Sequence, residues 1–178
     1  MRLLALLFML LPAAALANDW EALDQPGAFA IMRHAYAPGA SDPSNFQLED
    51  CATQRNLSDE GRAQARRIGA AFRERGITFE AVYSSQWCRC RETAELLGLG
   101  PVKDAPAFNS FFADFSLQEA RTSEARAFIE ATSGRRMIVT HQVNISALTG
   151  RSTRSGEVLV IRMEDGKAVV LGAILLPH

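Results

Sequence analysis

The feature that most constrains the fold is a short apolar segment, Phe29–Met32, which ends at Arg33 and His34. Turn residues flank it, with Pro26-Gly27 before it and Pro38-Gly39 after it. A continuous apolar run of this length between turn signals is typical of a strand buried in a sheet. Two interpretations of the Arg-His pair are open at this point. The pair either meets water at a strand end, or it is a cation and a nucleophile held on a rigid support.

Further apolar runs alternate with segments of helical periodicity. The strands predicted from these runs are Ala28–Arg33, Ala81–Tyr83, Met137–Thr140, Val158–Met163 and Ala168–Leu175. The predicted helices are Ser58–Arg75, Gln86–Leu97, Ser116–Thr132 and Gln142–Thr149. This alternation predicts an α/β fold, a three-layer α/β/α sandwich with a mostly parallel sheet. An Asp-Gly turn between the last two strands predicts a C-terminal antiparallel hairpin.

Two local details of this prediction concern the region before the third helix. Ser116 and Glu119 have the spacing of a capping box, in which each side chain bonds the other residue's backbone N–H. Pro101–Phe115 is expected to be a loop, and its four phenylalanines are expected to lie in the core or in the wall of a cleft.

Composition and the N-terminus indicate the class of protein. The length of 178 residues suffices for one domain, here residues 18–178. The net charge is −1, so the composition does not suggest a basic surface that binds nucleic acid. Residues 1–17 have the layout of a signal peptide, with Arg2, an apolar run and Ala15-Leu16-Ala17. We therefore expect cleavage after Ala17, a periplasmic or secreted product and no membrane span after cleavage. The alternative is an N-terminal anchor or a first helix.

The three cysteines fit an exported protein. Cys88 and Cys90 point away from each other if they lie in a helix, so a disulfide from Cys51 to one of them is expected. The less favoured alternative is a zinc site, which would need a further ligand from elsewhere.

Polar motifs follow three of the predicted strands. They are Arg33-His34, Ser84-Ser85 with Arg89 shortly after, and Thr140-His141. If these strands are parallel, the motifs share the carboxyl edge of the sheet, where open α/β sheets bind ligands. Two arginines and two histidines at one place suit phosphoryl transfer: a neutral imidazole attacks, and arginines with a protonated second histidine stabilise the phosphate. No metal or other cofactor is expected.

A long connection, Tyr36–Asn56, leaves directly from the Arg-His pair. Its length and its Pro, Gly, Ser and Asp content suggest a wall or lid of the site. Arg55 near its end is a candidate to bind substrate, and the alternative for Arg55 is a surface salt bridge.

These motifs together resemble the histidine phosphatase superfamily, which has the phosphoglycerate mutase-like fold. The resemblance rests on Arg33-His34, the run from Tyr83-Ser84-Ser85 through Arg89 to Thr93, Val139-Thr140-His141, and Arg55-x-Leu57 with Gly61 and Gln64-Ala65. It covers essentially the whole chain after the signal peptide. It implies that His34 becomes phosphohistidine, that Arg33 and Arg89 hold the phosphate and that His141 is the second histidine of the pocket.

Two departures from the family pattern affect the expected function. Ala35 replaces the glycine that usually follows the Arg-His pair, and Phe108-Asn109-Ser110 stands where many members carry a glutamate proton donor. Asp114 is the preferred replacement donor, with Glu119 and water as alternatives. The missing glutamate and the export signal favour a phosphatase over a mutase.

The resulting hypothesis is a metal-independent phosphomonoester hydrolase that acts through a phosphohistidine on His34. Its substrate would be a small-molecule, glycan or protein phosphomonoester. The alternative is a weak or inactive protein that binds a phosphorylated ligand. The sequence does not predict the oligomeric state.

Overall fold

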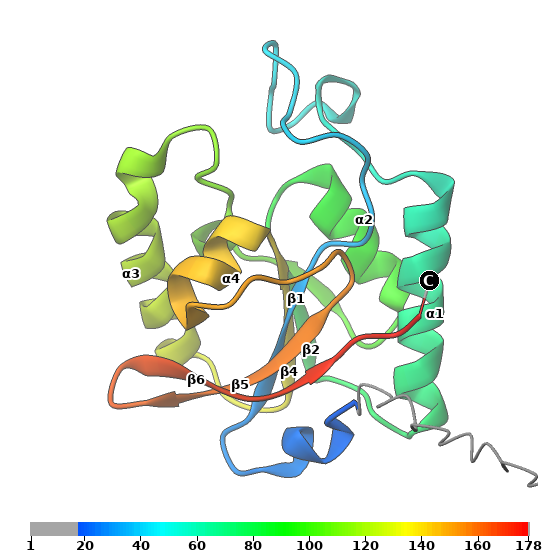
Figure 1. The fold of residues 1–178 in the computed structure, drawn as a ribbon, viewed down its shortest axis with the longest axis vertical. Coiled ribbons are helices and arrows are strands. Elements are labelled where there is room, and N and C mark those ends of the chain that lie inside the picture. The colour runs from blue at the N-terminus through cyan, green and yellow to red at the C-terminus, as the bar shows by residue number, and fades with distance from the viewer. Residues whose placement is uncertain (1–17, 178) are drawn as a thin grey trace, which may run out of the picture.

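A computed structural model describes residues 18–177 as one six-stranded sheet with helices on both faces (Figure 1). The strands are β1 Phe29–Arg33, β2 Ala81–Ser84, β3 Val102–Asp104, β4 Arg136–Thr140, β5 Val158–Glu164 and β6 Lys167–Ile174. The α-helices are α1 Asp59–Glu74, α2 Cys88–Leu97, α3 Gln118–Ala131 and α4 Gln142–Thr149. Short 3₁₀ helices lie at η1 Trp20–Asp24, η2 Cys51–Thr53, η3 Pro106–Phe108 and η4 Phe115–Leu117.

The strand order is β3-β2-β4-β1-β5-β6, and β1 to β4 run parallel. β5 pairs antiparallel with β1 and with β6, so the expected C-terminal hairpin is confirmed. Arg33 is paired with Thr140 in the β1–β4 register, and the backbone N–H of His34 donates to the carbonyl of Thr140 at 2.9 Å. This register brings His34 and His141 to the same edge of the sheet.

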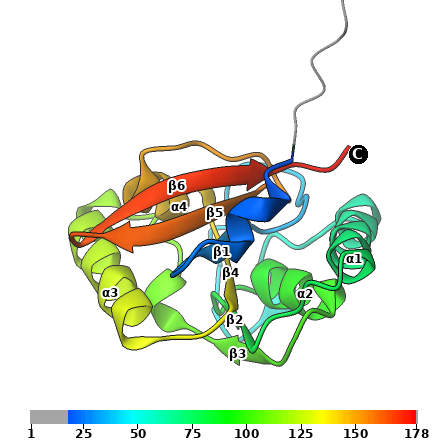
Figure 2. The same cartoon turned by 90° about the horizontal axis from the view of Figure 1, so that it is seen from below.

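Alternate residues of β1 enter two separate cores. Ala30 and Met32 pack on the face covered by α1 and α2, whereas Phe29 and Ile31 pack on the face covered by α3 and α4. All four side chains are fully buried because both faces of this central strand are covered. Figure 2 shows the two layers of helices on opposite sides of the sheet. The predicted three-layer sandwich is therefore confirmed.

Two local predictions are wrong. The region expected to be a loop contains β3, an edge strand whose only apolar residue is Val102. The expected capping box does not form, because α3 begins at Gln118, after the 3₁₀ helix η4. Asp114 accepts instead from both the backbone N–H and the hydroxyl of Ser116, at 3.0 and 2.6 Å.

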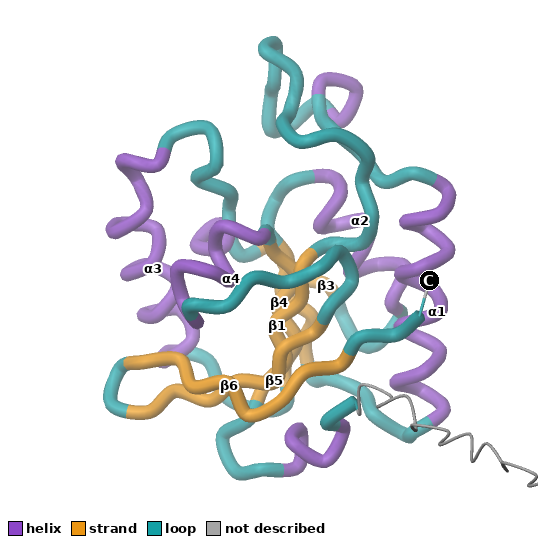
Figure 3. Tube along the Cα trace, viewed as in Figure 1, coloured by secondary structure: helices purple, strands orange, loops and turns teal. Residues whose placement is uncertain are grey.

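The long connection after β1 contains little regular structure. Figure 3 shows it as a loop that extends beyond the sheet at the end of β1, interrupted by the short helix η2. In residues 18–177 no helix is long and apolar enough to cross a membrane. The expected signal peptide, residues 1–17, lies outside the described residues.

Candidate active site

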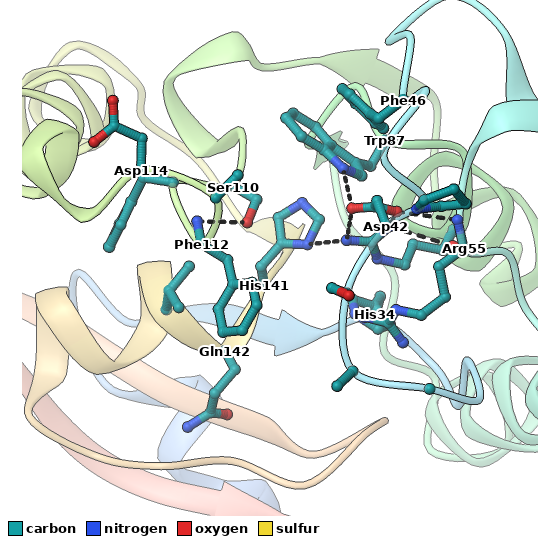
Figure 4. A pocket seen from close by; sticks show the side chains of 18 of the residues that line it. His34, Asp42, Phe46, Arg55, Trp87, Ser110, Phe112, Asp114, His141 and Gln142 are labelled. Atoms are coloured by element: carbon teal, nitrogen blue, oxygen red, sulfur yellow. Dashed lines mark hydrogen bonds and ion pairs between the residues drawn. The ribbon is translucent and has the colours of Figure 1, made fainter.

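A cavity of about 950 Å³ opens at the carboxyl edge of the parallel strands (Figure 4). Its lining includes five of the residues singled out in the sequence as an active site, namely Arg33, His34, Arg55, Arg89 and His141, together with Asp114 at its rim. They come from the ends of β1 and β4, the first turn of α2 and two loops. The structure therefore brings together motifs that are far apart in the chain.

His34 is held as one defined tautomer. Its Nδ1 lies 2.7 Å from the carbonyl oxygen of Ala35, and because a carbonyl only accepts, Nδ1 carries the proton. The Nε2 atom is then left with a free lone pair. Burial, followed by the charge of Arg89, lowers the pKa of His34 well below its ordinary value. A neutral imidazole with an unprotonated Nε2 is a nucleophile at neutral pH.

His141 faces His34, with their ring centroids 5.6 Å apart. Its Nδ1 lies 3.4 Å from Nη2 of Arg89 and must accept there, so its Nε2 carries the proton and donates to Oγ of Ser85 at 2.8 Å. Burial and the charge of Arg89 lower the pKa of His141 well below its ordinary value. Both pKa shifts favour the neutral form of the two histidines in the unliganded protein, whereas the sequence analysis expects a protonated second histidine beside the bound phosphate.

Arg89 makes a close ion pair with Asp42, a residue that the sequence did not single out. Its Nη1 and Nη2 donate to the two carboxylate oxygens of Asp42 at 2.7 and 3.2 Å. The same carboxylate accepts from Nε1 of Trp87 and from the backbone N–H of Arg55, both at 3.0 Å. These hydrogen bonds outweigh burial and lower the pKa of Asp42, which stays ionised. Arg89 thus already binds a planar anion supplied by the protein itself.

Arg33 and Arg55 keep unused donors beside this pair. Each donates one Nη1 to a backbone carbonyl, Arg33 to Thr153 at 3.1 Å and Arg55 to Ala37 at 2.6 Å. Within residues 18–177, the buried Nε atoms of Arg33, Arg55 and Arg89 have no hydrogen-bond partner. Burial and then the charge of Arg89 lower the pKa of both Arg33 and Arg55. Three arginines with one carboxylate between them leave an excess of positive charge that suits a further anion.

The alternative interpretation of Arg55, a surface salt bridge, is not observed: no ion pair joins its guanidinium to a carboxylate among the described residues. Arg55 lies instead in the cavity wall, and its carbonyl accepts from Nη1 of Arg89 at 3.2 Å.

Cross-links join the long loop to the start of α2. Cys51 and Cys88 form a disulfide with a Cα–Cα distance of 5.8 Å, which selects one of the two pairings expected. The side chain of Gln54 accepts from the backbone N–H of Cys88 at 2.9 Å. Both links involve Cys88, the residue before Arg89, so they hold the loop that carries Asp42 and Arg55 against Arg89.

Cys90 is free and buried, and burial raises the pKa of its thiol to about 12.

Helix α1 supports the other side of the loop through a close approach. A Cβ on Gly61 would lie 1.9 Å from the carbonyl oxygen of Tyr36, so only glycine fits there. Gln64 accepts from the backbone N–H of Tyr36 and donates to the carbonyl of Ser155, both at 2.9 Å. Thr93 of α2 accepts from the N–H of Ala35 at 3.1 Å. The segment that follows His34 is thereby fixed by two helices.

Among residues 18–177, no carboxylic acid is placed as a proton donor beside the two histidines. Asp114 is exposed, its hydrogen bonds with Ser116 lower its pKa, and Figure 4 shows its carboxylate directed away from His34. Asn109, which lies in the segment Phe108–Ser110 that the resemblance aligns with a glutamate, accepts from the hydroxyl of Ser85 at 3.3 Å and from the N–H of Gln86 at 2.9 Å. It therefore supports His141 through Ser85.

In the described part of the chain, no cluster of three or more His, Cys, Asp or Glu side chains could hold a metal.

Sequence reasoning missed three contributors to this site, Asp42, Trp87 as a cavity residue and Asn109 as a support of His141. The only signal for Asp42 was its position in a long polar loop next to the Arg-His pair. Its partner Arg89 is 47 residues away, a distance over which local patterns carry no information.

Comparisons with known proteins agree with this fold. A model of the histidine phosphatase superfamily, branch 1, matches residues 30–111. A solved protein histidine phosphatase, SixA, in complex with tungstate has a TM-score of 0.57 at 15% identity, over 83% of this chain and 96% of its own. A phosphoglycerate mutase from Thermus thermophilus has a TM-score of 0.60 at 19% identity, over 84% of this chain and 99% of its own. Comparison with curated protein sequences gives no match.

The fold and the arrangement of arginines and histidines define a phosphoglycerate mutase-like α/β domain. Residues 30–111, which include Arg33, His34, Arg55 and Arg89, are the part of the chain that matches the histidine phosphatase superfamily.

Proposed function

We propose that this protein is a metal-independent phosphomonoester hydrolase that acts through a phosphohistidine on His34. The observation that carries the proposal is the tautomer of His34, whose Nδ1–H donates to the carbonyl of Ala35 and leaves Nε2 free to attack. The surrounding arginines supply the positive charge that a phosphate dianion needs.

The proposed reaction has two steps. His34 Nε2 attacks phosphorus, the bond from phosphorus to the ester oxygen breaks, and the leaving group departs with that electron pair. Water then attacks the phosphohistidine, the N–P bond breaks and inorganic phosphate is released, which restores the neutral imidazole. In both steps Arg33, Arg55 and Arg89 would neutralise the equatorial phosphate oxygens. The pKa of His141 rises when a dianion is bound beside it, so it can then donate to the phosphate.

The test is hydrolysis of phenyl phosphate by the purified protein with EDTA present. We expect turnover in the wild type, loss of about 10³-fold or more in His34→Ala, and an acid-labile phosphoenzyme in the wild type alone. Arg62→Ala is a matched control, because Arg62 lies outside the cavity and pairs with Asp59 and Glu92. Full activity in His34→Ala would refute the nucleophile.

One observation favours a second candidate, a phosphate-pocket protein without turnover. The two carboxylates that line the cavity, Asp42 and Asp114, both have lowered pKa values and are poor acids at neutral pH. Tungstate, the oxyanion in the SixA complex, distinguishes the two candidates. Tungstate binding without hydrolysis of any phosphomonoester would support the binding protein.

We also propose that the protein is exported, as the layout of residues 1–17 suggests. The Cys51–Cys88 disulfide supports this, because such bonds persist in oxidising compartments. Cell fractionation with N-terminal sequencing tests it, and the expected first residue is Asn18. An intact Met1 in the cytoplasmic fraction would refute export.

A further inference from the structure

The cavity has a second half that the phosphate chemistry does not use. Beyond the arginines and histidines, its wall is formed by apolar side chains, namely Phe46, Trp87, Phe111, Phe112, Leu117 and Val143. Phe46 and Trp87 are stacked, with ring centroids 5.0 Å apart and an angle of 20° between the planes. Figure 4 shows Phe46 and Trp87 on one side of the cavity and Phe112 on the opposite side, near His141. The leaving group of a bound phosphomonoester would enter the space between them.

Two side chains of the apolar wall, Phe112 and Leu117, are exposed to solvent. The large hydrophobic side chains exposed in residues 18–177 are Tyr36, Phe112, Phe115 and Leu117, and the last three belong to one short segment at the cavity rim. Phe112 is 49% exposed, and its ring contacts that of Phe115 with centroids 5.9 Å apart. Apolar surface gathered at the mouth of a cavity favours a ligand that removes it from water.

The charges in the cavity exclude a second anionic group on the ligand. Its cations are Arg33, Arg55 and Arg89, all at the phosphate end, and no lysine or arginine lines the apolar half. The charged residue at the rim is Asp114, an anion. A carboxylate or a second phosphate on the leaving group would therefore lack a cation and would face Asp114. Oε1 of Gln142 accepts from the backbone N–H and the hydroxyl of Thr153, and its Nε2 donates to the hydroxyl of Ser146, so most of its hydrogen-bonding capacity is used within the protein.

The chemistry of the leaving group adds an independent constraint. Asn109 is an amide whose oxygen accepts from Gln86, and the pKa of Asp114 is lowered, so the described part of the cavity has no carboxylic acid placed to protonate the departing oxygen. An alkoxide is a poor leaving group without such a donor, whereas a phenolate can depart unprotonated because the pKa of a phenol is about 10. A phenolic ring also suits a wall that contains stacked aromatic side chains.

Resting on the proposed function, we propose that the substrates are aryl phosphate monoesters, small molecules with an uncharged aromatic leaving group. In the first step the phosphoryl group passes to His34 Nε2 and the P–O bond to the aryl oxygen breaks. The aryl group leaves as a phenolate, which takes a proton from solvent outside the cavity. Phe112 and the Phe46–Trp87 pair then set specificity by contact with the ring.

The test compares three substrates, 2-naphthyl phosphate, phenyl phosphate and glycerol 2-phosphate, in the wild type and in Phe112→Ser. Phe112 is half exposed, so this change leaves the core intact. We expect the wild type to have a kcat/KM about tenfold higher for 2-naphthyl than for phenyl phosphate, through a lower KM, and lowest for glycerol 2-phosphate. In Phe112→Ser the ratio of kcat/KM between 2-naphthyl and phenyl phosphate should fall by roughly threefold or more.

A matched control is Tyr36→Ser, because Tyr36 is an exposed aromatic side chain that does not line the cavity. Its ratio between naphthyl and phenyl phosphate should stay at the wild-type value. Equal or higher kcat/KM for glycerol 2-phosphate, or an unchanged ratio in Phe112→Ser, would overturn the aryl assignment and leave the phosphatase intact. No hydrolysis of any of the three substrates would instead overturn the proposed function.

Discussion

The disulfide between Cys51 and Cys88 allows a quantitative prediction about stability. It closes a loop with a sequence separation of 37 residues, and the chain-entropy relation for such a loop gives about 4 kcal/mol of stabilisation. This value is an upper bound, because denatured chains keep some structure. Replacing both cysteines by alanine, Cys51→Ala with Cys88→Ala, should therefore lower the free energy of unfolding by about 2–4 kcal/mol.

Urea unfolding followed by fluorescence, with and without dithiothreitol, measures this effect. Reductant should destabilise the wild type by about the same amount as the double substitution and should leave the double variant unchanged. Cys90→Ala serves as the control, because Cys90 is unpaired and its loss should not remove the sensitivity to reductant. The substitution will itself cost stability, since Cys90 is buried.

The same experiment tests whether the loop cross-link supports the site. Cys88 precedes Arg89, and the tethered loop carries Asp42 and Arg55, so reduction should also weaken tungstate binding by roughly tenfold. Thiol titration of the unfolded protein should give one thiol before reduction and three after it. Three thiols before reduction, or a wild-type stability indifferent to reductant, would refute the reasoning.

Three other predictions follow from single contacts in the site. Asp42→Asn should tighten tungstate binding about tenfold, measured by isothermal titration calorimetry, because a carboxylate no longer competes with the oxyanion for the guanidinium of Arg89. Weaker binding would contradict this and would mean that Asp42 orients Arg89. Burial lowers the pKa of His34 and His141 in the folded protein, so below pH of about 6.5 the unfolded chain binds protons that the folded protein does not. The free energy of unfolding should therefore fall as the pH drops below that value, by up to about 1.4 kcal/mol per pH unit for each histidine. A free energy of unfolding in urea that stays constant from pH 7.5 to 5.5 would contradict this. Gly61→Ala should lower the free energy of unfolding by about 1–3 kcal/mol in the same assay, because the alanine Cβ would overlap the carbonyl oxygen of Tyr36. An unchanged urea midpoint would show that the loop can move away from the new methyl group.

The sheet and its strand-end motifs could be predicted because they depend on short-range patterns. The run Phe29–Met32 is apolar at every position, and the structure buries it on both faces of the sheet. Once strands of this kind are taken as parallel, Arg33-His34 and His141 must meet at one edge. By contrast, β3 has one apolar residue at an exposed edge, so its sequence carries almost no strand signal.

The predictions that failed concern residues whose hydrogen-bond and ion-pair partners could not be identified from local sequence patterns. Ser116 and Glu119 have the capping-box spacing, but Asp114 lies close enough to bond Ser116 first, and the helix then begins two residues later at Gln118. The ion pair of Asp42 with Arg89 and the neutral state of His141 depend on three-dimensional burial and charge. No periodicity in the chain reports these quantities.

The position of β1 in the sheet has a consequence for how the chain folds. This strand is the first to be synthesised, yet both of its neighbours, β4 and β5, come from the last third of the chain, and Ala30 pairs with Met137 and with Val160. The apolar segment Phe29–Met32 of this strand therefore has no sheet partners until more than a hundred further residues have been made, and unpaired strands of this kind are prone to aggregate. Because His34 extends from this strand, the candidate site can assemble only late in folding. Recovery of oxyanion binding after dilution from urea would then report completion of the native sheet.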